Sequence, residues 1–466
     1  MQPPKIDNSQ DDLFQSRLSN QLNPKHEMMI LSKMVPWDEL SKEFSDCYCQ
    51  NDNKGGCPPK PIRLMVGLLL LQHMHNLSDE LVVQRWIENP YWQYFCGYDL
   101  LQWKMPIDPS SLTRFRNRIG EKRMERILSI TIDIALKSEF VKQKDLKKVI
   151  VDTTVMPKNI EYPTDSKLYE KARVKIVKLC QEHNISLRQN YNQVCKKAIR
   201  KLGSYLHAKQ MKRAKKEIKS LKTILGRIIR DTKRKINSSN NNETLTKIFK
   251  PTLDLAENLL NQKIKDKNKI YSLHESKVVC ISKGKSRNRY EFGSKVSLVM
   301  THKESLIISS QSLDGNPYDG HTLKSALNNA QEITKTRILT GFVDKGYKGH
   351  DVNPDDTRIF ISGQRKDISK TFKKQLKRRQ AIEPIIGHMK NDGKLGVSRL
   401  KGVVGDKINA VLTACGHNLR MIARYLRKLL KNSYFLSFLT RIIGFYWEIM
   451  TILSVIKGEN RRNLVA

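Results

Sequence analysis

The stretch Lys148-Val149-Ile150-Val151-Asp152-Thr153-Thr154-Val155 decides the fold class of this chain. Its apolar and β-branched side chains are typical of a β-strand, whereas the residues before it, 59–140, have helical spacing. Asp152 places a carboxylate near the end of the strand. The chain therefore changes at this point from a helical region to the first strand of a sheet.

Further segments with the composition of strands follow after residue 268. They span residues 277–281, 294–301, 306–312, 337–343 and 357–361. A helix is expected over 322–333, and a basic helical segment runs from 369 to about 395, with more helices to the end of the chain. These elements predict an α/β core that is interrupted after its first strand.

The interruption, residues 161–268, is predicted to be a basic helical insertion. Residues 161–250 contain 24 Lys and Arg but only 7 Asp and Glu. Apolar residues at helical spacing indicate long helices, arranged as a helical hairpin or a short coiled coil, with a turn at 237–242. These apolar residues are Ile218, Leu221, Leu225, Ile228 and Ile229.

Residues 59–140 are predicted to form a helical DNA-binding domain. Helices are expected over 62–75, 78–86 and 112–119. Ser78 is a typical N-cap, and the third helix carries Arg114, Arg116 and Arg118. Short helices with a basic third helix fit a helix-turn-helix-like module, whereas an ordinary bundle with a solvated arginine face is the alternative.

The ends of the chain have a different character. Residues 1–58 are polar and weakly patterned, so we expect an N-terminal arm with one short helix over 25–44 and no secretory signal. Residues 429–466 are predicted to form an apolar helical tail. Its longest apolar stretch, 434–456, is broken by Arg441 and Glu448, which favours a buried or docking helix over a membrane span.

The charge of the chain points to a polyanionic partner. Its 466 residues contain 85 Lys and Arg against 46 Asp and Glu, a net charge of +39. Nucleic acid is the usual partner of such a protein, and a membrane surface is the second candidate. The eight cysteines are scattered, which favours reduced thiols in the cytoplasm. Cys47, Cys49 and Cys57 lack a fourth ligand at structural-zinc spacing.

Three carboxylates stand out by their context. Asp152 and Asp344 each lie at the end of an apolar strand, and Glu383 lies in a basic helical segment. Mg²⁺ prefers oxygen ligands, and two such ions about 4 Å apart can activate a nucleophile and stabilise a leaving oxygen on phosphate. A single Asp at a strand end is more often a turn former, so the prediction rests on the three together.

Two basic residues lie near Glu383 on the predicted helix. Arg379 precedes it by four positions and Lys390 follows it by seven, so both fall near its face, where they could hold DNA phosphates. Pro384 is expected to kink this helix, because proline removes a helical hydrogen bond.

Other polar residues compete less well for these roles. Asp314 and Asp319 have Gly, Asn and Pro neighbours, which suit a turn, and His321 and Asp165 are interpreted as loop residues. Cys415 and His417 are interpreted as packing within a helix. The Lys283-Gly284-Lys285 sequence lacks a phosphate-loop pattern.

The chain resembles the IS5-type insertion-sequence transposases of the IS4/IS5 group. In residues 60–140 the resemblance lies in Asn76-Leu77-Ser78-Asp79-Glu80, Asn89-Pro90-Tyr91-Trp92-Gln93-Tyr94-Phe95-Cys96-Gly97 and Phe115-Arg116-Asn117-Arg118-Ile119-Gly120. Later, Asp344-Lys345-Gly346-Tyr347 and the spacing of Arg379, Glu383 and Lys390 match the DDE catalytic pattern of the group. The family has Tyr where this chain has Leu376, so a tyrosine contact to the DNA end is not expected.

The resemblance implies a ribonuclease-H-like mixed sheet over 141–428, with Asp152, Asp344 and Glu383 binding two Mg²⁺ ions, or Mn²⁺ in their place. It implies a bacterial, nucleoid-associated transposase that cuts at terminal inverted repeats and joins the 3′-OH to target DNA. A homodimer or larger synaptic complex without a membrane partner is expected. The alternatives are a metal-dependent nuclease of the same fold, a non-catalytic DNA-binding protein derived from a transposase, and a basic membrane-surface protein.

Overall fold

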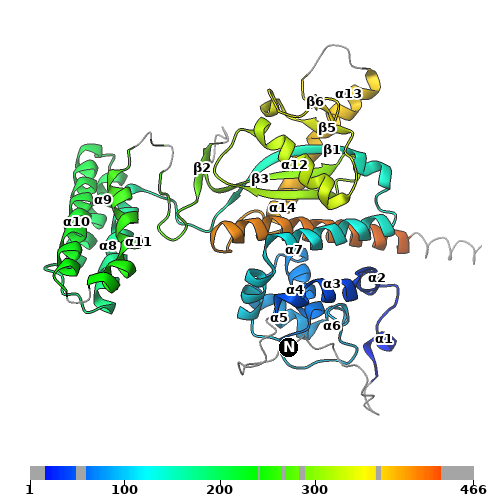
Figure 1. Cartoon of the computed structure of the whole chain (residues 1–466), viewed down its shortest axis with the longest axis horizontal. Helices are drawn as coiled ribbons and strands as arrows, with labels where there is room; N and C mark the ends of the chain where they lie inside the picture. Colours follow the sequence, from blue (N-terminus) through cyan, green and yellow to red (C-terminus); the bar gives the residue numbers. More distant parts are fainter. Residues whose placement is uncertain are drawn as a thin grey trace, which may run out of the picture.

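The protein is mixed α/β, and a computed structural model describes residues 16–48, 59–239, 242–263, 266, 269–282, 289–363 and 369–431. Figure 1 shows a sheet with helices packed around it, a group of helices below the sheet, and a separate helical bundle at one side. The mixed sheet with many helices is compatible with the expected α/β fold class.

The sheet has β1 (Lys148–Pro157) at its centre. Along one path the strand order is β2-β3-β1-β5-β6, and β4 also pairs with β3. β1 is antiparallel to β3 and parallel to β5, and β5 is parallel to β6. The remaining strands are β2 (Val279–Ser282), β3 (Tyr290–Thr301), β4 (Ile307–Leu313), β5 (Thr340–Val343) and β6 (Arg358–Ile361).

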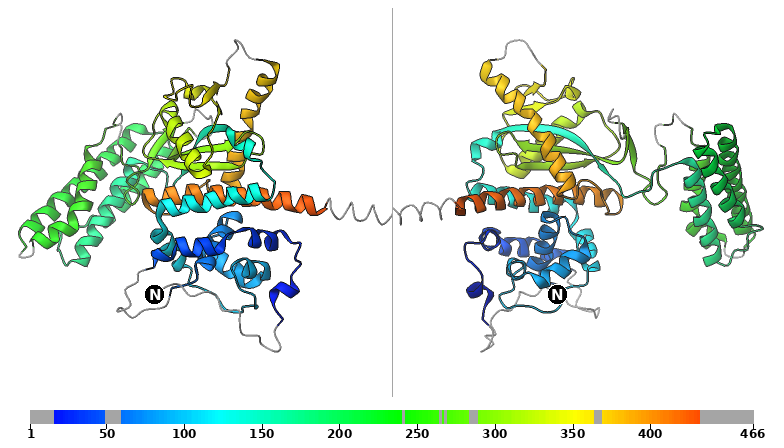
Figure 2. Two further views of the ribbon diagram at one scale, coloured as in Figure 1. Left: turned by 45° about the vertical axis from the view of Figure 1, so that its right-hand side comes forward. Right: turned by 180° about the vertical axis from the view of Figure 1, so that it is seen from behind.

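Helices cover both faces of this sheet. Figures 1 and 2, seen from opposite sides, show α12 (Asp319–Thr334) in front of the sheet and α13 (Lys370–Lys377) with α14 (Ile382–Asn391) behind it. The short helix η4 (Arg378–Ala381) joins α13 to α14. The expected helical segment is therefore divided into three pieces. Pro384 does not kink a helix interior, because it lies in the first turn of α14, where proline is tolerated.

The N-terminal region is helical from residue 18 onward. Its helices are α1 (Leu18–Gln21), α2 (Glu27–Met34), α3 (Trp37–Glu43), η1 (Ser45–Cys47), α4 (Ile62–Met74), α5 (Asp79–Glu88), α6 (Pro90–Phe95) and α7 (Ser110–Lys137). The expectation of one helix over 25–44 was wrong, because Pro36 separates α2 from α3. α7 has a break at Gly120, whose φ of +71° favours glycine, and the expected third helix ends at this break.

The helical region and the sheet share one apolar core. The same buried cluster contains Leu31 of α2, Leu68 of α4, Phe115 of α7 and Val151 of β1. A long helix over residues 402–431 joins the two parts, since Figure 1 shows it running beside α7 beneath the sheet. Arg420 of this helix donates hydrogen bonds to the carbonyls of His73 and Met74 at the end of α4. The N-terminal helices are thus held rigidly against the core.

The insertion forms a four-helix bundle, not a hairpin. Its helices have a second buried cluster of their own, which includes Leu168, Ile176, Leu225 and Phe249. Figure 2 shows the bundle standing apart from the sheet. The helices are α8 (Asp165–Glu182), α9 (Asn192–His207), α10 (Met211–Asn237) and α11 (Asn242–Asn261).

A buried ion-pair network joins the two ends of the insertion. Lys158, just after β1, donates to Asp406 at 2.7 Å and lies 3.4 Å from Glu275, which precedes β2. Ser294 and Ser398 donate to the same Asp406 carboxylate at 2.6 and 2.7 Å. Both acids and Lys158 are buried, so their charges are compensated mainly by one another. The network therefore holds both ends of the insertion against the core.

Several other expectations concern thiols and the tail. The cysteines that the structure describes, at 47, 96, 180, 195, 280 and 415, are all free thiols. Within the described ranges, no helix has the length and apolarity that a bilayer crossing needs. Cys49, Cys57, Lys283 and the stretch 434–456 lie outside the described residues.

Asp406→Ala is expected to lower the free energy of unfolding by about 3 kcal/mol, because it leaves Lys158 and two hydroxyls without their main acceptor. Thermal and urea unfolding followed by circular dichroism would measure this loss. Asp314→Ala removes an exposed carboxylate and is the matched control. Equal effects of the two changes would contradict the importance of the network.

Candidate active site

Two of the predicted carboxylates come from neighbouring parallel strands. β1 pairs with β5 from Lys148–Thr340 to Ile150–Phe342, and Asp152 and Asp344 each lie two residues beyond the last of these pairs. Asp152 is within β1, whereas Asp344 directly follows β5 and precedes the short helix η3 (Lys345–Tyr347). The pairing of the two strands therefore brings the two acids to the same end of the sheet.

The third carboxylate comes from α14. Glu383 lies in its first turn, and the Arg379 guanidinium of η4 is 3.1 Å from the Glu383 carboxylate. Arg379 also lies 3.6 Å from Asp152 and 3.9 Å from Asp344. One arginine thus contacts all three predicted carboxylates, and it brings together residues that are more than two hundred positions apart.

The exposure of these side chains is graded. Arg379 is 8% exposed and Asp152 20%, whereas Asp344 is 50% and Glu383 65% exposed. Nη1 of Arg379 is buried without a hydrogen-bond partner among the described residues. The site is therefore closed at the sheet and open to solvent at Asp344 and Glu383, where a large substrate could approach.

Tyr347 lies beneath the carboxylates. Its side chain is buried, and its hydroxyl has no hydrogen-bond partner in the described part of the chain. Burial raises the pKa of Tyr347 well above its usual value, and the nearby Asp152, Asp319 and Asp344 raise it further. The phenol consequently stays neutral, and it places a buried aromatic ring and one hydroxyl next to the carboxylates.

The carboxylates fit a divalent cation by their chemistry. Among the described residues, no three His, Cys, Asp or Glu side chains are gathered closely enough to hold a metal ion as they stand. Arg379 lies between the acids and supplies the positive charge that they share. Carboxylate oxygens are the ligands that Mg²⁺ prefers, so the same acids suit Mg²⁺ once the guanidinium is displaced.

Asp319 is a fourth acid close to this site. It begins α12, accepts a hydrogen bond from Thr153 at 2.8 Å, and pairs with Lys295 at 2.6 Å. Successive residues of a strand point to opposite faces of a sheet. Asp152 therefore points toward α14, whereas Thr153 points toward α12 and Asp319. The sequence predicts a turn at Asp319, whereas the structure places it at the start of α12. The alternation of side chains along β1 explains why Thr153, and not Asp152, contacts it.

The predicted DNA-contacting residues have unequal positions. Arg114 and Arg118 are exposed on α7. Arg116 is buried, pairs with Asp79 and donates to Thr113, so it does not face solvent. Lys390 lies near the end of α14, 3.9 Å from Glu291, and lines a cavity away from the three carboxylates.

Two comparisons identify relatives of this chain. Residues 16–118 match a family described as "Transposase domain (DUF772)". A protein of Rhizobium meliloti, named "Uncharacterized protein ORF8 in nfe locus", is 41% identical over 210 residues, which are 45% of this chain and all of that protein. Residues 16–118 of this chain belong to this transposase-domain family. No solved structure matches the chain.

Arg379→Met is expected to lower the melting temperature, because three carboxylates lose the positive charge they share. Added Mg²⁺ should raise the melting temperature of the variant more than that of the wild type. A tenfold gain in Mg²⁺ affinity would add about 1.4 kcal/mol of stability at saturation. Differential scanning fluorimetry with and without Mg²⁺ measures both effects. Lys377→Met, at an exposed position nearby, is the control, and an equal Mg²⁺ response in both variants would count against this arrangement.

Proposed function

We propose that this chain is a DDE-type DNA transposase, and that Asp152, Asp344 and Glu383 are its catalytic and metal-binding residues. The observation that carries the proposal is the convergence of these carboxylates, from β1, the end of β5 and α14, on the single guanidinium of Arg379. The family match adds that transposases share the N-terminal domain of this chain.

The strand order supports a ribonuclease-H-like core. The path β4-β3-β1-β5-β6 has antiparallel pairs on one side of β1 and parallel pairs on the other. The proposed organisation is an N-terminal segment over 1–58, whose helices α2 and α3 pack into the shared core, a DNA-binding domain over 59–140, a catalytic domain over 141–428 with its insertion at 161–268, and a tail over 429–466. Membership of the IS5 family is part of this proposal.

The chain's own groups would act on DNA as follows. Asp152 lies in a paired strand, Asp344 directly follows one and Glu383 lies in the first turn of a helix, so each oxygen donor comes from an ordered element and would close on the ions when they displace Arg379. Arg379 can exchange its carboxylate partners for a phosphate, since guanidinium binds both in the same forked geometry. When bound, two Mg²⁺ ions would supply activation of water or a 3′-OH and stabilisation of the leaving oxygen.

DNA would reach the site across basic surfaces. The net charge of +39 favours a polyanion, and the exposed Arg114 and Arg118 are the proposed contacts on α7. Arg379 and Lys390 would hold phosphates near the cut. The proposed partners are the terminal inverted repeats and the target DNA, bound by a homodimer or larger synaptic complex at the bacterial nucleoid.

Asp344→Asn, Asp152→Asn and Glu383→Gln are each expected to reduce cleavage of a labelled duplex from the element's end by more than about 100-fold, because changes beside metal ligands already cost 10- to 100-fold. Binding of the duplex should change little. Gel analysis of 3′-OH ends, in Mg²⁺ or Mn²⁺, measures cleavage, and a target plasmid reports end joining.

Asp319→Asn is the matched control for this series. It removes a carboxylate close to the site on the other face of the sheet, and it should leave cleavage within a fewfold of the wild type. If Asp319→Asn abolishes cleavage while Asp344→Asn cleaves normally, Asp319 and not Asp344 is the second catalytic carboxylate. Cleavage without joining would favour a nuclease, and binding without cleavage by the wild type would favour a non-catalytic DNA-binding protein.

The double variant Arg114→Gln, Arg118→Gln is expected to weaken DNA binding and to reduce the slope of log affinity against log salt by about two, since each lost phosphate contact removes about 0.9. Arg116→Gln should instead lower thermal stability, because it leaves Asp79 without its arginine. Fluorescence anisotropy at several salt concentrations and thermal melting separate the two effects. An unchanged slope in the double variant would exclude this surface.

A further inference from the structure

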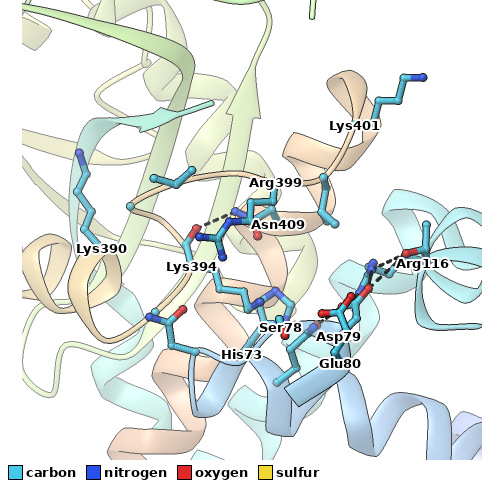
Figure 3. Close-up of a pocket in the computed structure, with 17 residues that line it drawn as sticks. His73, Ser78, Asp79, Glu80, Arg116, Lys390, Lys394, Arg399, Lys401 and Asn409 are labelled. Atoms are coloured by element: carbon cyan, nitrogen blue, oxygen red, sulfur yellow. Dashed lines mark hydrogen bonds and ion pairs between the residues drawn. The ribbon is translucent and has the colours of Figure 1, made fainter. Parts of the chain in front are cut away.

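A cavity of about 750 Å³ lies between the N-terminal helices and the segment that follows α14. Its size falls in the range of ligand sites, and it is distinct from the three carboxylates. In Figure 3, His73, Ser78, Asp79 and Glu80 line it from α4 and the start of α5, Lys394 and Arg399 from the segment after α14, and Asn409 from the helix over 402–431.

The lining of this cavity is cationic. Lys394 and Arg399 lie near its centre in Figure 3, while Lys390 and Lys401 flank it at either end. The partly buried Asp79 carboxylate is already paired with Arg116, and Gln72 also donates to it. Glu80 is the other acid of the lining, so the cavity carries an excess of positive charge.

Lys394 is a partly exposed cation of this lining. Its ammonium makes no hydrogen bond or ion pair with any residue that the structure describes, although the side chain is only partly exposed. Burial lowers the pKa of Lys394 to about 8, against the opposing effect of Asp79. An ammonium that is removed from water without a counter-ion is costly, and a bound anion would relieve this cost.

His73 marks the floor of the cavity. Burial, together with the charge of Lys394, lowers the pKa of His73 to about 3, so the ring is neutral. Nδ1 lies 3.0 Å from the carbonyl of Leu69, and Nε2 is buried without a hydrogen-bond partner in the described part of the chain. In the neutral ring Nδ1 donates to that carbonyl, so Nε2 is an acceptor that suits a water or an ammonium donor and does not itself bind an anion.

The segment that carries Lys394 is held firmly. The side chain of Asn409 donates to the carbonyl of Lys394 at 3.0 Å, and the amide of Leu395 donates to the carbonyl of Met389 at 3.1 Å. A Cβ at Gly396 would lie 2.5 Å from the carbonyl oxygen of Lys390, so only glycine allows this close turn. The position of Lys394 is therefore fixed before any ligand binds.

We propose that this cavity binds a phosphodiester group of the DNA strand that passes the three carboxylates, with Lys394 as its main anchor and Arg399 as a second cation. The proposal rests on the proposed function, because that function brings the strand to α14. Glu383 and Lys390 are seven residues apart, about 10 Å along a helix, or about three phosphates of one strand. The cavity would thus hold DNA beside the cut.

The test uses the full-length protein and a labelled duplex from the element's end, with Ca²⁺ in place of Mg²⁺ so that binding is measured alone. Lys394→Met keeps the length of the side chain and removes its charge. We expect affinity to fall about tenfold and the salt slope to fall by about one. Lys428→Met, exposed on the helix over 402–431, is the control and should leave both unchanged.

A second measurement locates the phosphate. Single methylphosphonate substitutions remove one backbone charge at a time, and one position should weaken binding to the wild type but not to Lys394→Met. Arg399→Met, at an exposed position, gives a second variant if Lys394→Met melts at a lower temperature than the wild type. Additive effects of Lys394→Met and every methylphosphonate would overturn the proposal.

Two further outcomes separate this proposal from others. If inorganic phosphate raises the melting temperature of the wild type but not of Lys394→Met, and DNA affinity is equal in both, the cavity is a site for a free anion and the proposal fails. If Lys394→Met weakens binding as expected but the wild type does not cut DNA in Mg²⁺, the cavity is a DNA site and the catalytic function alone fails.

Discussion

The pairing of β1 with strands on both of its edges is the constraint on which the rest of the structure depends. Its antiparallel partner β3 and its parallel partner β5 come from sequence positions far beyond the insertion. Because a one-residue change in register would turn every side chain of β1 to the other face, this pairing decides that Asp152 meets Arg379 and that Thr153 meets Asp319. The N-terminal helices are then packed against the same core through α7.

Local sequence patterns were sufficient for most of the core. The strand around Asp152, the five later strands and helix α12 were all predicted. Runs of β-branched residues and helical spacing are local patterns, so they can be recognised without knowing which segments pack together. The segment 25–44 was predicted as a single helix, whereas Pro36 divides it into α2 and α3. The four-helix arrangement of the insertion depends likewise on contacts between distant segments.

The three acids of the candidate site could be identified from the sequence, but the residues that surround them could not. Asp152, Asp344 and Glu383 stood out by local context, and the structure brings them together, while their roles stay a prediction. The central position of Arg379 requires η4 to bend the chain between α13 and α14, and no local pattern specifies that bend. The burial of Arg116 against Asp79 depends on the packing of α5 against α7, so an arginine row alone did not reveal which members face solvent.

The ion-pair network of Lys158, Glu275 and Asp406 joins the two ends of the insertion, and this has a consequence for changing the length of the insertion. The insertion leaves and re-enters the core at nearly one place, and the entropy of closing a loop grows only slowly with its length. A bundle attached in this way can be lengthened, shortened or exchanged with little effect on the sheet. The exposed connection at 208–210, between α9 and α10, is accordingly a suitable place to add a reporter domain to the chain.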